Sequence, residues 1–112
     1  MLRSAEFIRV LREPDGKRSS GPISARVKLN GLNGARLGVV VGKKGNASAV
    51  RRNRIKRIIR EQFRQQRNTL PNVDVVVQVF AAVDDKRLAQ WLSNQFNMLA
   101  ESKPNDHTDY AK

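Results

Sequence analysis

The residues in this sequence with the clearest chemical role are cations, and most of them lie in one stretch. Ten Lys/Arg residues fall between Lys43 and Arg67 against a single acid, Glu61, so this segment carries +9 of the net charge of +12 of the 112-residue chain. A folded surface this positive repels itself unless a polyanion neutralises it. Arginine also offers a planar pair of donors that suits phosphate. The sequence therefore predicts nucleic acid as the partner.

The spacing of these cations indicates a helix. Between residues 48 and 70 apolar side chains recur with the helical period, and Ile55, Ile59 and Phe63 fall on one side. The opposite side holds Asn53, Arg57, Arg60, Arg64 and Arg67. We expect a helix that buries its isoleucines and presents a ladder of guanidinium groups. The alternative for this charged face is simple solvation, and the alternative for Asn53 is an incidental polar residue.

Other kinds of functional site find little support. The chain has no cysteine, and its one histidine, His107, stands in a polar tail. Asp84 and Asp85 are better interpreted as the start of a helix than as a metal or catalytic pair. No apolar run approaches the ~20 residues that span a bilayer, and no secretory signal opens the chain. We expect no catalytic residue and no metal site.

The remaining pattern predicts one domain over residues 1–100, followed by a polar, disordered tail over 101–112. The elements expected are a helix over residues 4–11, a loop over 17–22, a strand over 23–29, a strand over 37–41, the basic helix over 48–70, a strand over 75–80 and a helix from Asp84. The turn residues Asn30-Gly31 and Asn33-Gly34 favour a hairpin between the first two strands. The valine strand is apolar enough to be covered on both faces. The prediction is an α/β (α+β) two-layer sandwich of order αββαβα.

Arg52-Asn53-Arg54, continued by Lys56-Arg57 and Arg60, resembles the RNR motif of the protein subunit of bacterial ribonuclease P. The similarity extends to the strand and Lys-Lys pair over 37–44, to the first helix over 6–11 and to the final strand and helix. It covers roughly residues 2 to 100. The complete pattern is specific, whereas Arg-Asn-Arg alone would not be.

The resemblance implies a left-handed strand–helix–strand crossover, where general rules favour the right hand. It also implies a cytoplasmic, monomeric protein that forms a 1:1 ribonucleoprotein with a catalytic RNA. That endoribonuclease removes the 5′ leader from precursor tRNA with Mg²⁺ held mainly by RNA, and the protein alone is non-catalytic and binds no metal tightly.

The same resemblance assigns residues to two surfaces. The RNA-binding residues of the motif are Arg52, Asn53, Arg54, Lys56, Arg57 and Arg60. Further phosphate contacts are expected from Lys43, Lys44, Arg51, Arg64 and Arg67. The cleft for the single-stranded leader is expected to contain Phe7, Leu11 and Lys28, with Leu11 as a plain apolar contact. For Phe7, ordinary core packing is the rival interpretation.

Three other functions remain as alternatives. A ribosomal or other structural RNA-binding protein would co-purify with ribosomal RNA instead of a separate RNA of a few hundred nucleotides. A DNA-binding protein would hold duplex DNA at moderate salt through its basic helix. A stand-alone nuclease would cut RNA with magnesium and no RNA subunit.

Overall fold

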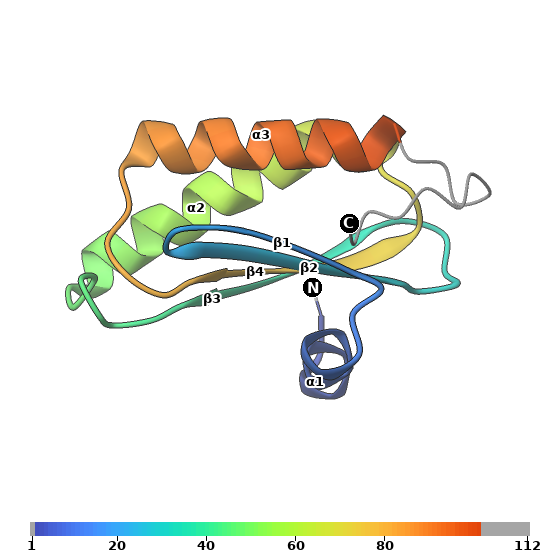
Figure 1. Ribbon diagram of the computed structural model, residues 1–112, viewed down its shortest axis with the longest axis horizontal. Coiled ribbons are helices and arrows are strands. Elements are labelled where there is room, and N and C mark those ends of the chain that lie inside the picture. Colours follow the sequence, from blue (N-terminus) through green and yellow to red (C-terminus); the bar gives the residue numbers. More distant parts are fainter. Residues whose placement is uncertain (1, 102–112) are drawn as a thin grey trace.

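A four-stranded sheet forms the middle of the molecule, with helices on both of its faces (Figure 1). The computed structural model describes residues 2–101. The elements in chain order are α1 (Ser4–Arg12), β1 (Gly16–Ser20), β2 (Ile23–Leu29), β3 (Arg36–Val41), α2 (Ala49–Gln66), the 3₁₀ turn η1 (Arg67–Thr69), β4 (Val73–Val79) and α3 (Asp85–Glu101). The α+β class predicted from the sequence is confirmed, with one more strand than expected.

The strands lie in the order β1-β2-β4-β3. β4 pairs antiparallel with β2, where Ala25 faces Val77, and parallel with β3, where Leu37 faces Val75. Its side chains are buried along both faces except at Gln78, which confirms a central strand covered on both sides. The helix α2 connects the parallel strands β3 and β4, and the left hand expected for this crossover stays a prediction.

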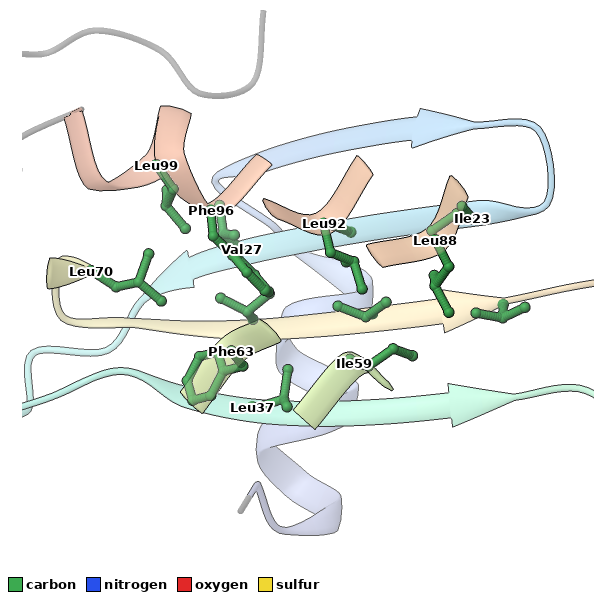
Figure 2. Packing of buried hydrophobic residues seen from close by; sticks show 14 of the residues in the cluster. Ile23, Val27, Leu37, Ile59, Phe63, Leu70, Leu88, Leu92, Phe96 and Leu99 are labelled. Atoms are coloured by element: carbon green, nitrogen blue, oxygen red, sulfur yellow. The ribbon is translucent and has the colours of Figure 1, made fainter. Parts of the chain in front are cut away.

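The main core lies between one sheet face and the helices α2 and α3 (Figure 2). Strand alternation directs Val75, Val77 and Leu37 to this face. Ile59 and Phe63 come from α2, and Leu88, Leu92, Phe96 and Leu99 come from α3. The rings of Phe63 and Phe96 meet edge to face with centroids 5.9 Å apart, which joins the two helices over the sheet.

The opposite face of the sheet carries α1. Leu2, Val10 and Val76 form a second, smaller cluster there, with Phe7 and Leu11 packed against it. The predicted two-layer sandwich therefore describes α2 and α3 over the sheet, while α1 forms a partial third layer.

Two details of the predicted topology are wrong. Residues 17–20, expected in a loop, belong to β1, which forms a hairpin with β2. The composition of this segment, with Lys, Arg and Ser, is typical of a loop. It can still form an edge strand, because backbone pairing with β2 holds it in place. Gly21, with φ of 56°, begins the two-residue turn that closes this hairpin.

The hairpin predicted between the strands at 23–29 and 37–41 does not form, because β4 lies between them. The connecting residues reach around the start of β4. Asn30 N–H donates to the Asn72 carbonyl over 3.1 Å, and Gly34 N–H donates to Asn72 Oδ1 over 2.9 Å. The order is thus αβββαβα. The expected tail lies outside the described residues, apart from Glu101 at the end of α3.

Candidate nucleic-acid interface

The basic helix α2 forms as its periodicity predicts. Ser48 is its N-cap, and the Ser48 hydroxyl accepts a 3.3 Å hydrogen bond from Arg51 N–H. Ile55, Ile59 and Phe63 follow at intervals of four residues and are buried against the sheet. This packing holds the opposite, cationic side of the helix toward solvent.

Part of this cationic side is unengaged. Asn53, Arg57 and Arg60 are exposed, and Lys56 is half-buried. Within residues 2–101 their side chains form no ion pair and accept or donate no side-chain hydrogen bond. These four residues are therefore available to an external anion.

Two other arginines of the helix are held by α3. Asp85 Oδ1 accepts from Arg51 Nη1 and Asp85 Oδ2 accepts from Arg54 Nε, each over 2.6 Å. Arg51 Nη2 also donates to the Val83 carbonyl over 2.6 Å. The hydrogen bond from Arg54, followed by that from Arg51, lowers the pKa of Asp85 below its ordinary value. Because 65% of the Arg54 side chain is exposed, a phosphate can still reach it.

Arg52 faces the loop that precedes the helix. Its Nη1 donates to the Asn46 carbonyl over 3.0 Å and to the Ala47 carbonyl over 2.6 Å. Asn46 is 1% exposed, and its Nδ2 donates to the Ala81 carbonyl over 3.0 Å. Arg52 thus fixes the loop after β3, from which the exposed Lys43 and Lys44 project.

The last two cations of the helix region also have partners. Arg64 forms an i, i+3 ion pair with Glu61 and is 72% exposed. Arg67, just beyond α2, donates from Nε to the Ala35 carbonyl over 3.1 Å. Arg64 lies one helical turn after Arg60, and Arg67 follows just beyond the helix, so both extend the positive surface along α2.

The contact between Asp85 and the two arginines should give a measurable pH dependence. A carboxyl group whose pKa is lower in the folded state stabilises the fold above its unfolded pKa and loses this contribution as pH falls through the folded value. For Asp85 the loss begins below about pH 4. We expect Asp85→Asn to lower the free energy of unfolding by up to about 1 kcal/mol at pH 7. Urea unfolding at pH 7 and pH 3 checks this, and an undiminished difference at pH 3 would contradict it.

On the other face of the sheet, Phe7 lies directly over a glycine. A Cβ atom at Gly38 would be 2.5 Å from Phe7 Cζ. The ring therefore occupies the space that a side chain at position 38 would need. Phe7 is half-buried and packs on the cluster of Leu2, Val10 and Val76, as does Leu11. Both expected roles for Phe7 stay open, because the ring packs on the sheet while the residue as a whole is only half-buried.

Replacing Gly38 tests this close approach. Gly38→Ala should force the Phe7 ring aside and lower the free energy of unfolding by about 1–3 kcal/mol. In the Phe7→Ala background the same change should cost less than about 0.5 kcal/mol, because the clash is gone. Urea unfolding of the four proteins measures the coupling. Equal costs in both backgrounds would show that the ring does not occupy this space.

Lys28, the third residue expected in the cleft, is partly engaged. Its Nζ donates to the Glu13 carbonyl over 2.8 Å and lies 3.9 Å from Asp15 Oδ1. Its side chain is 16% exposed. Lys28 therefore holds the end of α1 against β2, and its ammonium group is directed toward protein groups.

A polar network that we did not predict also ties α1 to the sheet. Arg36 donates from Nε and Nη2 to the two carboxylate oxygens of Asp74, each over 2.8 Å, and from Nη1 to Glu6 Oε2 over 2.8 Å. Asn30 Nδ2 donates to Asp74 Oδ1 over 3.0 Å. The Asp74 hydrogen bond is the main cause of a raised Arg36 pKa, while the Arg3 N–H and then Arg36 lower the pKa of Glu6. An acid inside a valine strand was the available sequence signal.

The same sheet face is uncovered beyond α1. Val40 and Gln78 are neighbours there, and Ser24 faces Gln78 from β2. Val40 is 40% exposed, and Phe80, just after β4, is 51% exposed. Ser24 Oγ, Gln78 Oε1 and Arg26 Nε are buried without a hydrogen-bond partner. Sequence reasoning missed this exposed part of the sheet face, although Gln78 interrupts the apolar run of the valine strand.

Residues 2–101 contain no group of three or more His, Cys, Asp or Glu side chains placed to hold a metal ion. Among these residues, no helix has the length and apolar character needed to cross a bilayer.

Comparison with known proteins connects this geometry to a family. The family model for ribonuclease P matches residues 1–102. The chain belongs to the ribonuclease P protein family. The ribonuclease P protein component of Pseudomonas aeruginosa is 35% identical over 107 residues, covering 93% of this chain and 79% of the relative. That of Ectopseudomonas mendocina is 37% identical over 112 residues, covering 97% and 84%.

Solved structures agree. The ribonuclease P protein of Thermotoga maritima, determined with 1-(4-fluorophenyl)-2-thiourea, has 30% identity and a TM-score of 0.72, covering 91% of this chain and 99% of that one. The Staphylococcus aureus protein, at 23% identity and a TM-score of 0.68, covers 88% and 89% and supports the fold.

Family membership decides the general function. The chain is the RNA-binding protein subunit of ribonuclease P, the ribonucleoprotein endoribonuclease of tRNA processing. This confirms the resemblance and replaces the ribosomal, DNA-binding and stand-alone nuclease alternatives.

Proposed function

We propose that this subunit binds two RNA surfaces with two faces of its fold. The solvent side of α2 binds phosphates of the catalytic RNA. The face that carries α1 binds the single-stranded 5′ leader of precursor tRNA. The observation that supports this division is the separation of the unengaged cations on α2 from the half-buried Phe7 on the opposite sheet face.

The residues proposed to contact RNA on α2 differ in whether the protein already engages their side chains. Asn53, Lys56, Arg57 and Arg60 bind RNA directly, because no protein group within residues 2–101 competes for them. Arg54 and Arg64 contribute through their exposed sides, and Arg51 and Arg52 orient the helix start while adding positive potential. Lys43, Lys44 and Arg67 extend the phosphate-binding surface at its two ends.

In the leader cleft, Phe7 and Leu11 form an apolar wall beside the uncovered sheet face. An aromatic ring fixed by its packing suits stacking with a base, which is sequence-tolerant because every base has a flat face. Lys28 adds positive charge at the end of α1 and fixes the position of that helix. The protein thereby gains affinity for substrate with a leader over product without one.

The proposal assigns no bond-breaking step to this chain. The protein joins the catalytic RNA as one copy per RNA, is monomeric when free and works in the cytoplasm. The magnesium ions of the reaction are held mainly by RNA. Lysine and arginine replace part of the counterion atmosphere that the folded RNA requires, which lowers the magnesium concentration needed.

Reconstitution tests the function. The purified chain, a bacterial ribonuclease P RNA and precursor tRNA are combined at low magnesium, and cleavage at the mature 5′ end is measured. We expect cleavage only when protein and RNA are both present, together with tighter binding of precursor than of mature tRNA. Site-specific cleavage by protein without RNA, or equal affinity for both tRNAs, would contradict the proposal.

A further inference from the structure

We propose that Phe80, Val40 and Gln78 form a second nucleobase subsite, at the end of the sheet face that α1 leaves uncovered. This inference rests on the proposed leader cleft. It adds residues that lie beyond Phe7 and Leu11, and it gives the cleft a means of distinguishing one base from another.

The place of these residues follows from strand register. Gln78 in β4 lies between Val40 in β3 and Ser24 in β2. Phe80 N–H donates to the Pro22 carbonyl over 2.8 Å, which continues the β2–β4 ladder by one more pair. Since side chains alternate along a strand, Phe80 lies on the same face as Gln78 and Val76. The α1 helix contacts this face at Gly38 and Val76. Val40 and Gln78 are the next residues on the same face, two positions further along their strands.

The exposure of Phe80 and Val40 and the polarity of Gln78 make this part of the sheet face suitable for binding a base. Phe80 is 51% and Val40 40% exposed, so a flat, apolar surface stands open to solvent at the end of a buried sheet. In the next register position, Gln78 Oε1 and Ser24 Oγ lie on neighbouring strands, and both are buried without a hydrogen-bond donor. An amide offers both an acceptor and donors, which is the combination that base edges require.

Charge favours a nucleic-acid occupant over an apolar peptide. Lys43 and Lys44 follow β3 at the same end of the sheet, and both are exposed. Arg26 lies on the same face but is directed toward α1, where its Nη1 donates to the Leu11 carbonyl over 3.2 Å. Lys17 on β1 is the register neighbour of Arg26 and is exposed. A single-stranded phosphate backbone that crosses this face meets Lys43 and Lys44 near the end of β3 and Lys17 on the edge strand β1, while a base rests on Phe80.

The test uses reconstituted ribonuclease P, with affinity measured for precursor and for mature tRNA. Phe80→Ala should weaken precursor binding by about fivefold or more and leave mature tRNA unchanged. Phe80→Leu, which keeps apolar bulk without a flat ring, should resemble Phe80→Ala. The control is Leu32→Ala, a large apolar residue that is 48% exposed in the loop at the other end of β2. It should match the wild type with both tRNAs.

Leaders with one abasic nucleotide locate the subsite. At one leader position the abasic change should weaken binding to the wild type but not to Phe80→Ala. At that position the wild type should prefer some bases over others, and Gln78→Leu should flatten this preference. Thermal melting of each variant verifies folding.

Three outcomes would overturn the subsite. Phe80→Ala could equal the wild type while the wild type still prefers precursor, which would remove the subsite and leave the proposed function intact. Equal weakening with both tRNAs would indicate a general contact. A wild-type holoenzyme with no preference for precursor would overturn the proposed leader cleft itself.

Discussion

Arg36→Ala should lower the free energy of unfolding by about 3 kcal/mol. This is the largest effect on stability that we expect from replacing one partly exposed side chain. Removing the guanidinium leaves Asp74, whose side chain is 9% exposed, with Asn30 Nδ2 as its remaining partner among the described side chains. A buried charge without its counter-charge is costly. The same change releases Glu6 and with it the start of α1.

Urea unfolding at pH 7 measures this effect. Arg57→Ala, which removes an exposed arginine without a partner in residues 2–101, is the matched control and should stay within about 0.5 kcal/mol of the wild type. In the double variant Arg36→Met/Asp74→Asn, part of the lost stability should return, because the buried carboxylate of Asp74 is also removed. An Arg36→Ala variant as stable as the control would show that the network does not hold α1.

The double variant Arg57→Ala/Arg60→Ala should weaken binding to the catalytic RNA by about tenfold or more at low salt while preserving the fold. Both side chains are exposed, and alanine favours a helix. If the interface neutralises roughly six phosphates, the wild-type plot of log affinity against log salt should have a slope of about −4 to −5. The variant slope should be shallower by about 1 to 2.

Filter binding across a salt series measures both quantities. Arg9→Ala/Arg12→Ala removes the same charge from exposed positions on α1 and serves as the control. If this control weakens binding as much as the α2 variant does, total charge and not the α2 surface determines affinity. A wild-type slope near zero would exclude the cationic surface as the interface.

The sequence by itself determined the parts that depend on local pattern. The period of Ile55, Ile59 and Phe63 places the cations of α2 on its outer side, and burial of these residues against the sheet follows from the same period. The apolar run of β4 predicted a strand covered on both faces for the same reason. Asp84 as a helix start is likewise local, and its Oδ2 accepts from Arg87 N–H over 3.1 Å.

Only the tertiary structure decided which of the cations remain free. Arg51, Arg54, Arg57 and Arg60 look alike in the sequence, yet Asp85 engages the first two from a helix more than 30 residues away. The strand order could not be predicted either, because β4 enters between β2 and β3 through contacts distant in sequence. The same holds for Phe7 over Gly38, where a missing side chain in one strand makes room for a ring from α1. Pairings of this kind depend on packing between distant segments, and no local period records them.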